Sequence, residues 1–146
     1  MSWITITETD LKTRIDPSEL AAYRAAATDG GQADPVTGLI ASVTDLVRGY
    51  AGVRYALGAG NTIPERLLDT TLSIIRYRII TRIPGLVVDE HRTKEYDDAI
   101  KLLERVAKGD FALEEPETAD TETTGGATPS IFVRRRKFSR NDEAGL

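Results

Sequence analysis

The chain holds few residues from which a catalytic or metal site could be built. It contains no cysteine and a single histidine, His91, so thiolate ligands and cysteine nucleophiles are excluded and the imidazole lacks the partner that a metal or base-nucleophile site needs. Asp97 and Asp98 are adjacent, and adjacent residues on a helix project about 100° apart, so we interpret them as solvated acids rather than an acid/base pair. The glycines of residues 58–61 (GAGN) lack the third glycine and the preceding strand of a dinucleotide-binding loop. We therefore expect no enzyme, no cofactor and no metal.

Residues that could contact a partner gather at the end of the chain, in residues 131–146 (IFVRRRKFSRNDEAGL). Aromatic side chains anchor interfaces and arginines donate charge-assisted hydrogen bonds, so this composition predicts an extended docking segment. The candidate partner-binding residues are Ile131, Phe132, Val133, Arg134, Arg135, Arg136, Lys137, Phe138, Ser139 and Arg140. The alternative interpretation is a solvated, charged terminus.

An acidic segment, residues 114–130 (EEPETADTETTGGATPS), precedes this docking segment. It carries acids but no base and almost nothing apolar, so it cannot bury enough surface to offset the entropy of ordering it. The sequence therefore predicts three units: a helical domain at residues 1–113, a disordered linker at 114–130 and the docking segment at 131–146.

Charge and hydropathy narrow the class of protein further. The net charge is -4, which argues against a dedicated nucleic-acid binder, although bases are concentrated in the docking segment. No apolar run approaches the roughly 20 residues that span a bilayer, and residues 1–6 (MSWITI) lack the basic and apolar regions of a signal peptide. We expect a cytoplasmic or particle-borne protein without contact to a membrane.

Caps and prolines predict where the first helices begin. A short helix ends near Leu11, with Thr5, Thr7 and Thr9 as candidate caps. Asp16-Pro17 and Asp34-Pro35 each place a capping carboxylate before a proline at the first helical position, which predicts helices from residue 17 to about 27 and from residue 35 to 57. Apolar positions in the longer helix recur every three or four residues. Its glycines at 38, 49 and 52 suggest close helix approach or a local bend.

Two more helices complete a predicted all-α bundle. We expect residues 56–63 to form a loop and Pro64 to open a helix that runs to about 83, apolar on more than one face and therefore central in the bundle. A fifth helix begins near Asp89 and ends at Gly109. Arg76, Arg78 and Arg82 project from the central helix, either as ion pairs and snorkelling stems or as partner contacts.

Several motifs together resemble the head-tail connector (adaptor or neck) proteins of Mu-like phages and prophages. The elements that carry the resemblance are Asp45-x-x-x-Gly49-Tyr50-x-x-x-Arg54-Tyr55-x-Leu57, Ile63-Pro64-x-x-Leu67-Leu68 before Arg76-Tyr77-Arg78, Tyr96-x-x-Ala99-x-x-Leu102-Leu103-x-x-Val106-Ala107-x-Gly109, and Phe138-Ser139-Arg140 followed by Asn141-Asp142. The pattern spans nearly the whole chain, and its most specific parts are the GYxxxRYxL element and the terminal FSR.

The resemblance implies a helical adaptor domain that assembles into a ring, expected to be a dodecamer, beneath the portal protein at the capsid vertex. DNA would pass through the channel without specific binding, and the implied partners are the portal and a tail-side neck or stopper protein. The expected location is the neck of the virion, after assembly from the host cytoplasm. An alternative is a small-terminase-like nucleic-acid-binding protein that grips phosphates with residues 134–137.

Overall fold

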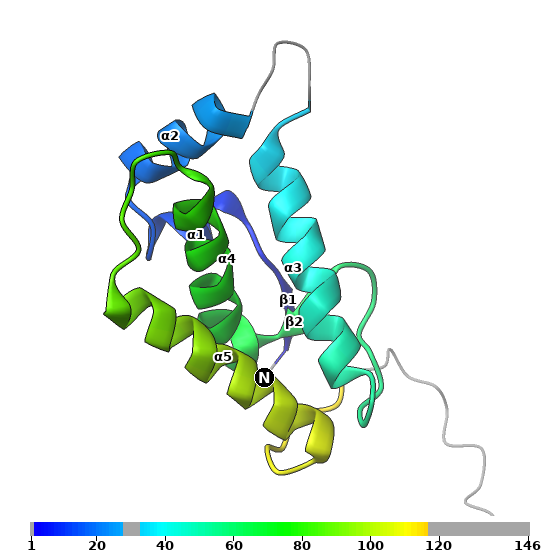
Figure 1. The fold of residues 1–146 in the computed structure, drawn as a ribbon. Coiled ribbons are helices and arrows are strands. Elements are labelled where there is room, and N and C mark those ends of the chain that lie inside the picture. The colour runs from blue at the N-terminus through cyan, green and yellow to red at the C-terminus, as the bar shows by residue number, and fades with distance from the viewer. Residues whose placement is uncertain (1, 28–32, 117–146) are drawn as a thin grey trace, which may run out of the picture.

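The computed structural model describes residues 2–27 and 33–116, and within them helices predominate (Figure 1). The elements are β1 (Trp3–Thr5), α1 (Glu8–Lys12), α2 (Pro17–Ala27), α3 (Pro35–Ala51), β2 (Thr62–Pro64), the 3-10 helix η1 (Glu65–Leu67), α4 (Leu68–Arg82) and α5 (Glu90–Lys108). The predicted helical fold is confirmed in outline, but a small sheet is added to it. No helix in this part of the chain is both long and apolar enough to cross a membrane.

The predicted helix starts are confirmed where a carboxylate precedes a proline. Asp16 Oδ1 accepts a hydrogen bond of 2.8 Å from the Ser18 amide as α2 begins. Asp34 Oδ1 accepts one of 3.1 Å from the Val36 amide as α3 begins. At α1, Thr7 is the cap among the three candidate threonines, and its amide and hydroxyl both donate to Asp10 Oδ2, at 2.8 and 2.7 Å.

The third helix is shorter than its apolar pattern predicted. It ends at Ala51, with Gly52 as its C-cap, so the prediction that it reaches Leu57 is wrong. Close approach of another helix, one of the two interpretations of these glycines, is not found at two positions, because a Cβ built at Gly38 or Gly49 would meet no atom of a neighbouring element within 4 Å. Among the three glycines at 38, 49 and 52, Gly52 is the crowded one, with the Arg48 carbonyl oxygen 3.1 Å from the position of such a Cβ.

A two-stranded antiparallel sheet lies where a loop and a helix start were predicted. β1 pairs with β2 so that Trp3 faces Pro64 and Thr5 faces Thr62. The prediction that Pro64 opens a helix is correct only in part: Pro64 ends β2 and caps the 3-10 helix η1, and the α-helix α4 begins at Leu68. Strands of three residues are too short to show an alternating apolar pattern, and these two pair across a long stretch of chain.

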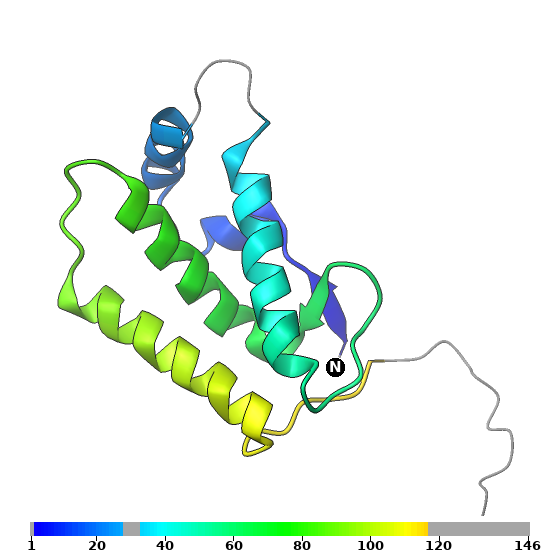
Figure 2. The same ribbon diagram turned by 45° about the vertical axis from the view of Figure 1, so that its right-hand side comes forward.

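Helix α4 is the central helix, as predicted. It packs against α2, α3 and α5, and Figure 2 shows it between α3 and α5. Its residues Ile74, Ile75, Ile79 and Ile80 are fully buried, so it is covered on more than one face. Helix α5 ends at Gly109, which adopts a left-handed conformation with φ 88 and confirms the predicted stop.

Candidate partner-binding site at the root of the C-terminal segment

The predicted partner-binding residues, 131–140, lie outside the described residues, as does the predicted linker from residue 117 onward. The structure does place the segment that leads to them, residues 109–116, drawn in yellow at the end of α5 in Figure 2. This segment determines where the chain leaves the helical body.

The end of α5 turns the chain toward the end of α3. The Asp110 amide donates a 2.9 Å hydrogen bond to the Arg105 carbonyl oxygen, which closes the helix around the left-handed Gly109. The guanidinium of Arg54 lies against this turn, since a Cβ built at Gly109 would be 3.5 Å from Arg54 Cζ. A residue other than glycine would be strained here by its backbone conformation.

Three side chains then hold the segment by its backbone carbonyl groups, and we refer to Trp3, Tyr55 and Arg66 as the exit clasp. The Tyr55 hydroxyl donates to the Phe111 carbonyl oxygen at 2.9 Å, Arg66 Nη1 donates to that of Ala112 at 3.0 Å, and the Trp3 indole donates to that of Glu114 at 3.3 Å. The Arg66 guanidinium also lies over the Phe111 ring, 5.4 Å from its centroid. The donors come from β1, from the loop after α3 and from η1.

The indole of Trp3 is itself positioned by the loop before β2. Arg48 lies over its ring at 6.0 Å and donates hydrogen bonds to the carbonyl oxygens of Thr62, at 2.6 Å, and Gly58, at 3.0 Å. A Cβ at Gly58 would come within 2.7 Å of the indole. Gly58, which belongs to the glycines considered for a dinucleotide-binding loop, thus leaves space for the Trp3 indole.

The other sequence candidates do not converge on a site. His91, Asp97 and Asp98 are all exposed on α5, as expected of solvated residues. Arg76 pairs with Glu95 of α5 at 3.8 Å and Arg78 donates to the Ser42 hydroxyl at 3.4 Å, so these two form intramolecular contacts.

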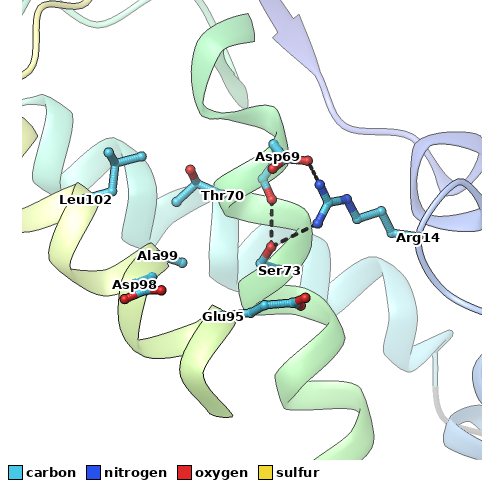
Figure 3. Close-up of a pocket in the computed structure, with 8 residues that line it drawn as sticks. All are labelled: Arg14, Asp69, Thr70, Ser73, Glu95, Asp98, Ala99 and Leu102. Carbon is cyan, nitrogen blue, oxygen red and sulfur yellow. Dashed lines mark hydrogen bonds and ion pairs between the residues drawn. The ribbon is translucent and has the colours of Figure 1, made fainter. Parts of the chain in front are cut away.

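A shallow hollow of about 280 Å³ lies between α4 and α5 (Figure 3). Arg14 reaches its rim, where it pairs with Asp69 and donates to the Ser73 hydroxyl at 3.4 Å. Ala99 and Leu102 of α5 form the opposite wall. Within residues 2–27 and 33–116, no group of three or more acidic, histidine or cysteine side chains is arranged to hold a metal ion.

A second set of charges joins the N-terminal helices. Arg24 of α2 pairs with Glu8 of α1 at 2.9 Å and with Asp34, the cap of α3, at 3.1 Å. These hydrogen bonds lower the pKa of both carboxyl groups, and they raise the pKa of the Arg24 guanidinium. The Ser18 hydroxyl and amide lower the pKa of Asp16 in the same way. The network links three helices and contains no reactive group.

Comparison with known proteins identifies the family. The model of the family described as Bacteriophage Mu, Gp36 matches residues 6–130. The chain belongs to this family. No curated protein and no solved structure matches it. Membership in the Gp36 family makes this a Mu-like phage protein and supports a structural or assembly role in the phage.

The Gp36 family match includes every described helix, two residues of the exit clasp and the predicted linker, whereas residues 131–146 follow it. Two residues of the GYxxxRYxL element, Arg54 and Tyr55, contact the segment after α5. The motif thus holds the root of the C-terminal segment. Sequence reasoning missed this role, because the acceptors are backbone carbonyl groups and leave no trace in the residue types of residues 111–114.

Proposed function

We propose that this Gp36-family chain is a head-tail connector subunit, which assembles as a ring beneath the portal and links the capsid to the tail. The family match over residues 6–130 is the observation that supports the proposal most directly. The connector role itself comes from the motif resemblance, in which Tyr55 and Gly109 take part. The proposed role is structural and requires no catalytic residue.

The exit clasp suits a subunit that must reach a partner beyond its own body. Trp3, Tyr55 and Arg66 fix the chain through residue 114, so a docking segment starts from a defined point. We propose that residues 131–140 dock on the portal or on a tail-side neck or stopper protein.

The charge of the chain suits a channel through which DNA slides. Proteins that hold DNA gain affinity by neutralising phosphates and releasing counterions. A chain with a net charge of -4 gains little from this effect. We therefore propose that DNA passes through the ring without specific binding, in a virion assembled from subunits in the host cytoplasm.

Inactivation of the gene in the phage or prophage tests the connector role. We expect DNA-filled heads and free tails that fail to join, seen by electron microscopy, and tailed particles again when the chain is supplied from a plasmid. Purified wild-type particles should contain the chain. Normal yields of tailed, infectious particles without it would contradict the proposal.

A DNA-binding measurement separates the alternative, nucleic-acid-binding function. Binding through residues 134–137 should weaken steeply as salt rises, because each phosphate contact releases counterions. Steep, salt-dependent binding combined with absence of the chain from particles would favour that alternative over the connector.

A further inference from the structure

The large apolar side chains that are exposed in residues 2–27 and 33–116 occur in two loops. Val53 and Leu57, in the loop between α3 and β2, are 66% and 43% exposed. Leu86 and Val87, in the loop between α4 and α5, are 39% and 87% exposed. We refer to these pairs as the α3–β2 patch and the α4–α5 patch. Apolar residues that cluster on the surface mark contact sites more often than residues exposed singly.

The two patches lie at opposite ends of the body. Helix α5 starts directly after the α4–α5 patch and ends at Gly109, against Arg54 of the α3–β2 loop. The 19 residues of this helix correspond to about 28 Å at the usual rise per residue. Figures 1 and 2 both show the two loops on opposite sides of the molecule.

The charges beside the two patches have opposite signs. Exposed Asp89 and Glu90 follow the α4–α5 patch, whereas exposed Arg54 and Lys108 lie at the other end of α5, beside the α3–β2 patch. None of these four side chains forms an ion pair with another described residue. Exposed Arg82 and Lys94 offset part of the negative charge at the first end. Exposed Glu104 and Asp110 offset part of the positive charge at the second end, where Arg105 adds a further base.

We infer that the α4–α5 patch of one copy packs on the α3–β2 patch of a second copy. Apolar side chains would then meet apolar side chains, and the acids that follow residue 87 would face the bases around residue 54. A second copy is the occupant because one end of the folded body presents acids and the opposite end presents bases, each beside exposed apolar side chains. This inference rests on the proposed ring and identifies the surfaces between its subunits.

The contact joins two different surfaces, so it can be repeated from copy to copy. Such head-to-tail contacts produce a closed ring when the rotation between neighbours closes, and a filament when it does not. Contact between identical patches would instead stop at a dimer.

Val53→Asp and Val87→Asp test the two surfaces separately. Both side chains are mostly exposed, so the fold should persist, which circular dichroism can verify. Each variant should raise the dissociation constant for self-association about tenfold or more, because the new carboxylate replaces an apolar contact and must lose its hydration when the two patches meet. Ala41→Asp, which places the same charge at an exposed position in the middle of α3, should leave the assembled mass unchanged.

Mixing the two variants distinguishes a head-to-tail contact from a symmetric one. A Val53→Asp copy keeps a normal α4–α5 patch, and a Val87→Asp copy keeps a normal α3–β2 patch. Each variant alone should sediment as a monomer, while an equimolar mixture should form heterodimers that grow no further. Where the wild-type chain assembles in solution, a mixture that stays monomeric overturns the inference, as does wild-type assembly by both single variants.

Cysteine cross-linking can detect the contact even if the subunits associate weakly. Because the chain contains no cysteine of its own, only the introduced residues can form disulfides. The double variant Val53→Cys, Val87→Cys should form a ladder of oligomers under mild oxidation, and each single variant should stay uncross-linked. Dimers of a single variant, or no ladder from the double variant, overturn the inferred contact. Absence of the ladder with normal incorporation into phage particles would leave the connector role standing, whereas absence of the chain from particles would overturn the role itself.

Discussion

The Tyr55 hydroxyl donates a 2.9 Å hydrogen bond to the carbonyl oxygen of Phe111, which lies 56 positions further along the chain. The bond connects the loop after α3 to the segment after α5, two regions that are distant in the sequence. Because Arg66 and Trp3 donate in the same way to the carbonyl oxygens of Ala112 and Glu114, the chain beyond α5 is held through its backbone. The position of this segment therefore depends on the donors more than on its own side chains.

Tyr55→Phe removes one donor of the exit clasp and little else. We expect a loss of about 0.5 to 1.5 kcal/mol in the free energy of unfolding, as for a single partly buried hydrogen bond. Amide hydrogen exchange in residues 110–116 should accelerate more than in α4, because the effect is local.

Tyr50→Phe is the matched control, since Tyr50 is also a partly buried tyrosine packed on the core and its hydroxyl makes no hydrogen bond with the described residues. It should leave both the unfolding free energy and the exchange of residues 110–116 close to wild type. Equal effects of the two changes would show that the hydroxyl of Tyr55 does not hold the segment.

Replacing glycine with alanine should change the stability of the fold in opposite directions at two positions. Gly49→Ala should stabilise the chain by about 0.5 to 1 kcal/mol, because the new methyl group enters open space on a helix and alanine has the higher helix propensity. Gly58→Ala should destabilise it by about 1 to 3 kcal/mol, because the methyl group would displace the Trp3 indole. Urea unfolding midpoints of both variants would check the signs, and a gain at Gly58 would contradict the role assigned to it.

The network around Arg24 predicts how stability changes in acid. Arg24 lowers the pKa of Glu8 and Asp34 in the folded chain, so the unfolded chain takes up protons at a higher pH than the folded one. Their contribution is present at neutral pH and is lost in acid, as the pH falls through the lowered pKa values of the two carboxyl groups. Arg24→Gln should therefore be less stable than wild type at pH 7, and the difference should shrink toward pH 3.

Thermal unfolding of both chains across this pH range would measure the difference. A gap between wild type and Arg24→Gln that stays constant or widens in acid would show that these ion pairs do not supply the pH-dependent stability. Lys12→Gln is a useful control, since it removes only the more distant 3.6 Å contact with Glu8.

The central helix should dominate the stability of the domain. Leu72 and Ile75 are buried in α4, so Leu72→Ala or Ile75→Ala should each cost about 2 to 5 kcal/mol through lost burial and the cavity that remains. Arg134→Ala, in the docking segment, should barely change the unfolding midpoint. Equal losses for core and docking-segment variants would show that the boundary of the domain is misplaced.

Local signals allowed most helix boundaries to be predicted from the sequence. Asp34 before Pro35 marks a start because the carboxylate bonds an amide two residues away, and Gly109 marks an end because it adopts a left-handed conformation. Both signals involve residues only a few positions apart in the sequence. They can therefore be recognised without knowledge of the fold.

Features that depend on distant contacts could not be predicted in this way. The apolar period of α3 continues to Leu57, yet the helix stops at Ala51, and a period alone does not tell a packed residue from an exposed one. The β1–β2 pair and the exit clasp both join residues far apart in the chain. Their partners are backbone groups, which every residue offers, so no pattern of residue types identifies them.

The docking segment itself carries the last prediction. Deletion of residues 131–146 should leave a folded subunit that no longer joins the phage particle, because the exit clasp lies before the deletion while the proposed anchors, Phe132 and Phe138, lie within it. Replacing both phenylalanines with alanine should block incorporation as fully as the deletion if the segment docks on protein. If its arginines only bind DNA, the double replacement should be nearly silent, while replacing residues 134–137 with alanine should abolish DNA binding. Normal infectious particles from the double phenylalanine variant would contradict docking on protein and favour the nucleic-acid hypothesis.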